Sequence, residues 1–176
     1  MAELVEATNI SEMTNEQIKQ QLSEHFSFIT EWEEQYGMLT FSVPAGDNLE
    51  VLQYLYNNES MQFQFLTDLT AIHYPDRTGE ELCVVYHLHN LVENVRIRMK
   101  SYVSVANPDI HSATSVFSGA NWMERETYDF FGVNFQGHPD LRRILNVDEM
   151  DYFPMRKEYP MEDPTRMDKD DEMFGR

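Results

Sequence analysis

Cysteine is almost absent from the 176-residue sequence, which contains Cys83 alone. An internal disulfide is therefore excluded, and so is a self-contained iron–sulfur cluster, which needs about four Cys or His ligands. The sequence also has no GxGxxG motif and no Walker-type phosphate loop, so no nucleotide site is visible. We expect no metal, flavin or other cofactor to be bound by this chain itself.

Positive charge is scarce as well. Thirteen Lys and Arg residues stand against 31 Asp and Glu, which gives a formal net charge of −18. A surface of this kind repels nucleic acids and anionic lipid head groups. The composition therefore excludes a nucleic-acid-binding protein, and it favours basic protein partners or simply solubility.

Long hydrophobic runs are also missing. No stretch of about 18 apolar residues occurs, so we expect no transmembrane helix and no direct membrane insertion. The opening MAELVEATNI lacks the basic and apolar regions of a signal peptide. We therefore expect a protein of the cytoplasm, or one held on the cytoplasmic side of a membrane by something else.

The apolar periodicity predicts an α+β fold. A capping box at Thr14 and Gln17 opens one helix, and Asp47 with Glu50 begins a second. Alternating residues predict five strands, over residues 26–32, 38–43, 63–72, 81–89 and 95–105. Because the links between neighbouring strands are short, we expect a mixed, largely antiparallel sheet with helices packed on one face.

Two groups of side chains on these strands allow a functional interpretation. Cys83, His87 and His89 share one strand face, but they lack a visible fourth zinc ligand, so a buried thiol and two sheet histidines are favoured. The last strand carries a basic face, which is either a solvated surface or a docking patch for an acidic partner. That basic face consists of Arg96, Arg98 and Lys100.

Residues 118–145 carry the most specific pattern. We expect Ser118 to cap a helix that ends at Gly132 in the left-handed conformation. At 100° per residue, one side of this helix bears Trp122, Arg125, Glu126 and Asp129. Arg125 and Asp129 lie four residues apart, so they are expected to pair along the helix.

The carboxylates of this helix allow two interpretations. Glu124, Glu126 and Asp129 fall within two turns and would suit acid–base catalysis or metal binding. The alternative is a polar helix side that docks on a partner. Docking is favoured, because no His or Cys at helical spacing completes a metal site, and we assign no catalytic residue. A stand-alone hydrolase that uses these carboxylates with His138 is the weaker alternative, and it predicts an active monomer.

The periodicity disappears after Gly132. Four of the seven prolines and five of the eleven methionines lie beyond it, together with many apolar side chains. Such a segment forms no core of its own but can become ordered against another protein. We therefore divide the chain into an α+β core domain, residues 1–132, and an extended partner-wrapping C-terminal arm, residues 133–176.

Two runs resemble the motifs of one family. ERETYDFFGVNFQGHPDLRRIL, residues 124–145, resembles the signature of the 30-kDa subunit of the proton-pumping NADH:quinone oxidoreductase, respiratory complex I. PMRKEYP, residues 154–160, is similar to the second motif of that family. Phe153 departs from the pattern, since small residues are more usual there.

The resemblance implies a member of the hydrophilic arm of complex I that carries no flavin, cluster or quinone ligand. FMN and iron–sulfur clusters would belong to partner subunits, and the enzyme activity would be that of the complex, which couples electron transfer from NADH to quinone with proton translocation. The chain would contact subunits D and B on the cytoplasmic side of the inner (plasma) membrane, as a peripheral protein. The equivalent subunit of a membrane-bound hydrogenase, or of a complex with another electron donor, is the alternative.

By analogy with the family, the polar helix residues would dock at the subunit boundary, and the basic residues would anchor the arm to carboxylates of a neighbour. The partner-interface residues predicted in this way are Glu124, Arg125, Glu126, Asp129, His138, Arg142, Arg143, Arg156 and Lys157.

Overall fold

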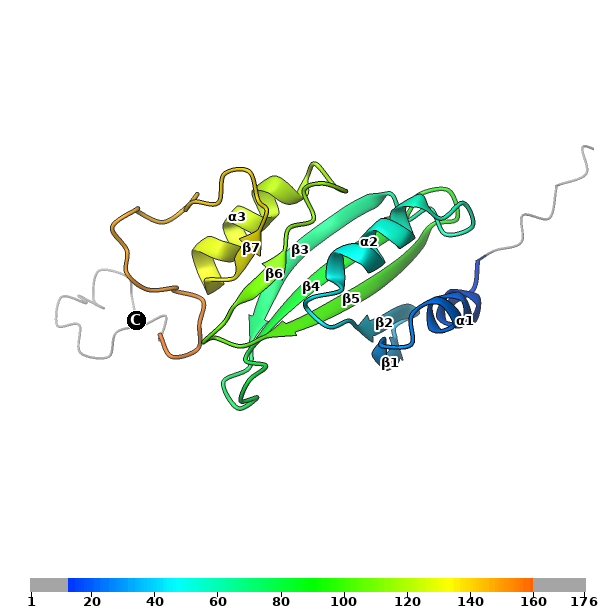
Figure 1. The fold of residues 1–176 in the computed structure, drawn as a ribbon, viewed down its shortest axis with the longest axis horizontal. Helices are drawn as coiled ribbons and strands as arrows, with labels where there is room; N and C mark the ends of the chain where they lie inside the picture. Colours follow the sequence, from blue (N-terminus) through cyan, green and yellow to red (C-terminus); the bar gives the residue numbers. More distant parts are fainter. Residues whose placement is uncertain (1–12, 160–176) are drawn as a thin grey trace, which may run out of the picture.

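A mixed five-stranded sheet forms the centre of the computed structural model, which describes residues 13–159 (Figure 1). The strand order is β1-β2-β5-β4-β3, and every neighbouring pair is antiparallel except β2 and β5. The strands are β1 (Thr30–Gln35), β2 (Met38–Ser42), β3 (Phe65–His73), β4 (Leu82–Asn90) and β5 (Val95–Val103). With three helices, α1 (Asn15–His25), α2 (Asn48–Asn57) and α3 (Ala120–Phe131), the predicted α+β class is confirmed.

Helices α1 and α2 build the main core against the sheet. The predicted capping box of α1 is present, since the Thr14 side chain accepts from the N–H of Gln17 and the Gln17 side chain accepts from the N–H of Thr14. Burying each leucine of these helices is worth about 1.5–3 kcal/mol. The buried residues of α1 and α2 that join the core are Ile18, Leu22, Val51, Leu52 and Leu55. They pack with Leu39, Phe41, Leu69, Ala71, Val84, Tyr86, Leu88, Ile97 and Met99 of the sheet.

The first strand differs from its prediction. The alternation of residues 26–32 predicted a strand, but β1 begins only at Thr30. Phe26 instead ends α1 by donating its N–H to the carbonyl of Leu22, and both Phe26 and Ile29 are buried. The link between α1 and β1 therefore buries apolar side chains in the core. Alternating apolar side chains in a loop give the same sequence pattern as a strand, which explains the wrong prediction.

Two short strands lie outside the prediction. β6 (Asp109–His111) and β7 (Asn134–Gln136) pair in parallel as a separate two-stranded sheet. The side chains of Asn134 and Gln136 both donate to the carboxylate of Asp109, at 2.6 and 2.8 Å. Three residues are too few to show a period, so the sequence pattern did not reveal these strands. Packing thus continues past residue 132, and the division of the chain there stays a prediction.

Helix α3 lies along β3, the edge strand of the five-stranded sheet. The Thr127 hydroxyl is 3.4 Å from the carbonyl oxygen of Leu69, so the helix covers an edge that would otherwise be free to pair. The helix ends, as predicted, at Gly132, which has a φ of +75°. The expected Ser118 cap is wrong. Gly119 is the N-cap residue, and no side chain caps the helix. The chain enters the helix through a turn in which the N–H groups of Ala120 and Asn121 already donate to the carbonyls of Phe117 and Ser118.

Within residues 13–159, every helix is too short or too polar to cross a membrane. Figure 1 shows α1 and the segment that follows β7 at opposite ends of the molecule. The predicted lead-in, apart from Met13, and the last dozen residues lie outside the described residues.

Candidate partner-binding site

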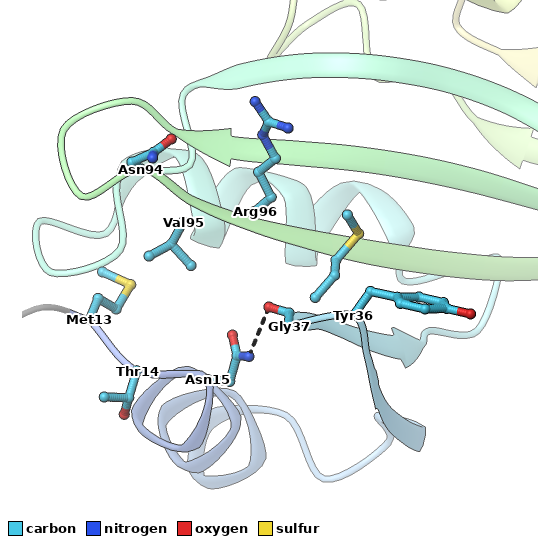
Figure 2. Close-up of a pocket in the computed structure, with 9 residues that line it drawn as sticks. Met13, Thr14, Asn15, Tyr36, Gly37, Asn94, Val95 and Arg96 are labelled. Atoms are coloured by element: carbon cyan, nitrogen blue, oxygen red, sulfur yellow. Dashed lines mark hydrogen bonds between the residues drawn. The ribbon is translucent and has the colours of Figure 1, made fainter.

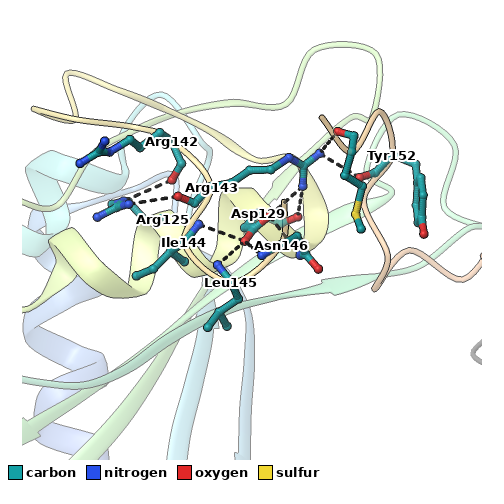
Figure 3. Close-up of polar contacts among 9 residues, drawn as sticks. Arg125, Asp129, Arg142, Arg143, Ile144, Leu145, Asn146 and Tyr152 are labelled. Atoms are coloured by element: carbon teal, nitrogen blue, oxygen red, sulfur yellow. Dashed lines mark hydrogen bonds and ion pairs between the residues drawn. The ribbon is translucent and has the colours of Figure 1, made fainter. Parts of the chain in front are cut away.

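After β7 the chain folds back over α3 instead of extending away from it. We call residues 138–159 the strap. Its backbone carries only turns and bends. One backbone hydrogen bond joins it to α3, from Met155 to the carbonyl of Phe130, so its position depends mainly on contacts that involve side chains. Figure 3 shows the centre of these contacts, where polar groups of the strap converge on one carboxylate of the helix.

That carboxylate belongs to Asp129, which is fully buried. Its Oδ2 accepts three consecutive backbone N–H groups, those of Ile144, Leu145 and Asn146, at 3.1, 2.8 and 2.9 Å (Figure 3). Its Oδ1 accepts from Nη1 of Arg143 at 2.7 Å and from the Asn146 amide at 3.0 Å. Burial alone would raise the pKa of Asp129, but these hydrogen bonds outweigh it and hold the pKa well below its usual range. Asp129 is therefore an anion already bound by its own chain.

Arg143 fastens the strap to itself and to the helix. Besides its ion pair with Asp129, its guanidinium donates to the Asp129 carbonyl at 3.0 Å and to the carbonyls of Met150 and Tyr152 at 2.7 and 2.9 Å. It also lies 5.2 Å from the ring centre of Phe153. A planar guanidinium can satisfy several acceptors at once, so this one side chain holds two separate parts of the strap.

Arg125 contributes a second tether. Its Nε and Nη2 donate to the carbonyls of Arg142 and Arg143 at 3.2 and 3.0 Å, and its guanidinium lies 5.3 Å from the ring centre of Trp122. The expected pair between Arg125 and Asp129 is therefore not the arrangement found. Backbone carbonyls of the strap accept the hydrogen bonds of Arg125, and backbone N–H groups of the strap donate most of those that Asp129 accepts. Both side chains are buried, and a hydrogen bond is electrostatically stronger in a buried site than in water.

A third tether lies near the end of the strap. Nε of Arg156 donates to the carbonyl of Phe131 at 2.7 Å, and its guanidinium lies 4.6 Å from the ring centre of Phe153. Burial lowers the pKa of Arg156. The backbone N–H of Lys157 donates to Nδ1 of His73 at 3.0 Å. The strap is thus tied to the sheet as well as to α3.

The start of the strap is held by His138. Its Nδ1 accepts the N–H of Asp140 at 3.0 Å, so Nε2 carries the proton and donates to the carbonyl of Asn121 at 3.0 Å. Arg142 points outward, and its one ion pair within residues 13–159 is with Asp140. Glu126 is exposed on the helix. Among the nine predicted residues, Glu126, Arg142 and Lys157 are exposed and are the most available to another molecule.

Glu124 lies on a different side of α3 and is also fully buried. Its carboxylate accepts from the Ser112 hydroxyl and the Ala113 N–H, both at 2.6 Å, which joins the helix to the chain after β6. Burial raises the pKa of Glu124 to about 7, although both hydrogen bonds oppose that rise. Glu124 is therefore a proton-binding group inside the fold.

This burial predicts a pH effect on stability. Because the folded protein binds the Glu124 proton more tightly than the unfolded chain, the free energy of unfolding should fall as the pH rises from about 4.5 to about 7. Glu124→Gln should remove this part of the slope, since glutamine mimics the protonated acid. Urea unfolding between about pH 5 and about pH 8 measures it. Glu126→Gln, at an exposed position, should keep the wild-type slope; equal slopes in all three proteins would contradict the expectation.

Five of the nine predicted interface residues hold the strap from inside, namely Arg125, Asp129, His138, Arg143 and Arg156. Glu124 and Asp129 are buried within the chain, so neither can contact a partner directly, and Asp129 can act on one only through the position of the strap. A partner role for the nine residues stays a prediction. The predicted set omitted the apolar side chains on the outer surface of α3 and the strap. These are Trp122, Leu145, Val147, Tyr152, Met155 and Tyr159. The sequence signal of Trp122 was its place on the polar side of the helix, and that of the others was apolar character inside a proline-rich segment.

The carboxylates of α3 do not gather into a metal site. Within the described residues, no three His, Cys, Asp or Glu side chains converge in a way that could hold an ion. Glu124 and His138 are bonded to different parts of the chain. Cys83 is buried, and burial raises the pKa of its thiol to about 11, so it stays protonated at neutral pH.

Two solved structures have a similar fold. A chain of the membrane-bound sulfane sulfur reductase, an archaeal respiratory membrane complex, aligns with a TM-score of 0.70 and 26% identity over 83% of this chain and 85% of that one. The trypsin-resistant fragment (1-134) of Nqo5 aligns with a TM-score of 0.59 and 31% identity over 70% of this chain and 98% of that one. The fold is therefore that of a subunit found in respiratory complexes.

The sequence comparisons identify the family. The family described as "Respiratory-chain NADH dehydrogenase, 30 Kd subunit" matches residues 41–165. An NADH-quinone oxidoreductase subunit of a Nocardioides species is 45% identical over 125 residues, which is 71% of this chain and 50% of the relative. This chain belongs to the 30-kDa subunit family, and the resemblance of its two motifs is confirmed. The chain spans about half the length of the first curated relatives that it matches.

Proposed function

We propose that this chain is a structural subunit of the hydrophilic arm of respiratory complex I, and that it carries no cofactor of its own. The observation that carries the proposal is the strap, whose backbone is held by polar groups of α3 while five of its apolar side chains are exposed. These are Leu145, Val147, Tyr152, Met155 and Tyr159. Leu145 and Val147 are 65% and 63% exposed, although Asp129 holds the backbone beneath them. The names of the curated relatives, which describe subunits of NADH-quinone oxidoreductase, support the choice of complex.

In this proposal the strap is a preformed binding surface. Aromatic and aliphatic side chains that enter a partner's pockets dominate the energy of most interfaces. A segment already held by buried hydrogen bonds loses less conformational entropy on binding than a free one. The tethers from Asp129, Arg143 and Arg125 therefore serve docking by keeping Leu145, Val147 and Trp122 in place, and they need no carboxylate from a neighbour.

The complex would supply the chemistry. Electrons would pass from NADH through FMN and iron–sulfur clusters of partner subunits to quinone, with coupled proton translocation. The neighbours of this chain would be subunits D and B. The chain would lie on the cytoplasmic side of the inner membrane as a peripheral protein, held there through the complex. Catalysis would belong to the complex, with no catalytic residue in this chain.

One observation favours a second candidate. The structural relative with the TM-score of 0.70 comes from an archaeal respiratory membrane complex described as a sulfane sulfur reductase. The chain could thus serve as the equivalent subunit of a membrane-bound hydrogenase or of another complex that does not oxidise NADH. The two candidates predict the same fold for this chain, so only the identity of the other subunits distinguishes the electron donors.

Co-purification tests the proposal. The full chain, tagged in its own host, is isolated from gently solubilised membranes, and the recovered proteins are identified by mass spectrometry. We expect several subunits in stoichiometric amounts, including flavin, iron–sulfur and membrane-spanning proteins. NADH-binding subunits among them would name complex I, and their absence from an otherwise intact complex would favour the second candidate. A lone protein would overturn both.

A matched pair of variants tests the docking surface. Leu145→Asp with Val147→Asp should leave folding within about 0.5 kcal/mol of wild type, since both side chains are exposed, but should strongly reduce the recovery of partner subunits. The control is Leu91→Asp with Val92→Asp, at positions 65% and 78% exposed in the β4–β5 turn. The control should co-purify normally. Equal recovery from both double variants would contradict docking through the strap.

A further inference from the structure

The sheet has a second face, which the strap does not form. Register across the strands places its side chains in four rows, with Phe65, His89 and Arg96 in the first and Asp68, His87, Arg98 and Thr40 in the second. The third row contains Thr70, Val85, Lys100 and Ser42, and the fourth contains Ile72, Cys83 and Tyr102. We call these rows the open face.

No helix of the described residues packs on the open face. Val84 and Tyr86 of β4 belong to the core under α1 and α2, whereas their neighbours Cys83 and Val85 are buried but lie outside that core. Figure 2 shows the same alternation on β5, because Val95 points toward Met13 beside α1 and Arg96 points to the other side. In the part of the chain that the structure describes, the open face is therefore covered by side chains of the sheet and by Arg77 of the β3–β4 turn, and by no helix.

Most charges on the open face are paired within the chain. Lys100 lies 3.8 Å from Glu33, and Arg77, which reaches in from the β3–β4 turn, lies 3.4 Å from Glu31. The basic residues of the first two rows, Arg96 and Arg98, take no part in these two pairs. Carboxylates thus reach this face from β1, beside Lys100 and Arg77, and Asp68 adds one at the β3 edge.

Arg96 and Arg98 are different. Nε of Arg98 donates to Nε2 of His87 at 2.9 Å, and burial followed by the charge of Arg98 lowers the pKa of His87, which keeps that imidazole neutral. Within the described residues, no carboxylate oxygen lies within 4.0 Å of either guanidinium. Asp68 of β3 lies in the row of Arg98, and it is 3.7 Å from Nδ1 of His87. Glu33 of β1 continues that row beyond Thr40, and it pairs with Lys100. Phe65, 47% exposed, adds an apolar group in the same row as Arg96, on the far side of His89.

We propose that the open face binds an acidic segment of another subunit, with Arg96 and Arg98 receiving its carboxylates and Phe65 contacting its apolar side chains. Charge complementarity carries this choice. In a chain of net charge −18, most of the surface repels an acidic partner. Two neighbouring guanidiniums without a carboxylate offer bidentate binding there. The same net charge disfavours a nucleic acid, which would meet repulsion around this small patch.

Zero-length cross-linking tests this contact in the intact complex. A water-soluble carbodiimide joins a lysine amine to a carboxylate that touches it, so Arg96→Lys supplies the reactive amine at the right place. We expect digestion and mass spectrometry to find position 96 joined to an Asp or Glu within an acidic stretch of another subunit. Arg96→Glu should lower retention of that subunit during purification by roughly tenfold, through lost attraction and added repulsion.

Lys19→Glu is the matched control, since Lys19 is exposed on α1 and carries the same charge change away from the open face. It should retain all subunits. The inference rests on the proposed assembly, but different results would contradict the open-face contact and the assembly itself. A complex that co-purifies while position 96 is joined to nothing, to this chain itself or to a second copy of it would overturn the open-face contact alone. Recovery of the chain without any subunit would overturn both.

Discussion

Replacing Asp129 by alanine should lower the free energy of unfolding by about 3–5 kcal/mol and release the strap from α3. The substitution removes the acceptor of three backbone N–H groups and leaves the guanidinium of Arg143, which is only 9% exposed, without its ionic partner. A buried charge that loses its counter-charge costs far more than an exposed one. Arg143 also ties the carbonyls of Met150 and Tyr152, so the damage should spread along the strap.

Two measurements check this expectation. Urea denaturation gives the loss of stability, and hydrogen exchange locates it, with faster exchange expected in residues 138–159 and little change in the sheet. Glu126→Ala is the control, because Glu126 lies on the same helix but is exposed, and it should change stability by no more than about 0.5 kcal/mol. Unchanged exchange in the strap of the Asp129 variant would show that the carboxylate does not hold it.

The same carboxylate predicts an acid sensitivity. Its pKa is lowered in the folded protein, so its contribution is complete above the unfolded pKa of about 4 and is lost as the pH falls toward the folded value. The sign is opposite to that of Glu124, whose contribution declines as the pH rises. Asp129→Ala should therefore lose most of its difference from wild type in strong acid, which unfolding at decreasing pH would reveal.

Gly132→Ala should be the second severe change. Gly132 has a φ of +75°, which strains any residue with a Cβ, and that Cβ would stand 2.5 Å from a ring carbon of Phe153 and 2.6 Å from Nη2 of Arg156. Strain of about 1–2 kcal/mol adds to about 1–3 kcal/mol of overpacking. The side chains that must move belong to the strap, so the substitution should push the strap from the end of the helix.

Gly79→Ala separates these two causes. Gly79 also has a positive φ, of +87°, but a Cβ there would meet nothing within 4 Å. It should therefore show the conformational strain alone, about 1–2 kcal/mol, and no change in proteolysis of the strap. The Gly132 variant should lose more stability and should be cleaved faster within residues 138–159. Equal losses from the two variants would mean that Phe153 and Arg156 adapt without cost.

Local pattern was sufficient wherever the cause of a structure lies within a few residues. The capping box at Thr14 and the left-handed end of α3 at Gly132 depend on neighbouring residues, and both were predictable. The strands rich in alternating apolar residues were also found close to their observed bounds. The prediction failed where the pattern was short or ambiguous, as at β6, β7 and the aromatic segment before β1.

The partners of the α3 side chains could not be predicted in this way. The carboxylate of Asp129 could have paired with Arg125 one helical turn away, and nothing local shows that residues 143–146 supply better donors. That choice depends on the strap folding back past Gly137 and burying both groups. Burial then changes the energies, since a low-dielectric site rewards complete hydrogen bonding and penalises any group left unpaired.

The sequence by itself determined the α+β class, the family to which the chain belongs and the excess of acidic residues, because these follow from periodicity, motifs and composition. Only the tertiary structure decided that the polar side of α3 faces its own strap and that the apolar side chains of the strap face outward. It also decided that β2 pairs with β5 and leaves Arg96 and Arg98 on an open face. Contacts between distant residues depend on how the whole chain packs, and no local pattern specifies them.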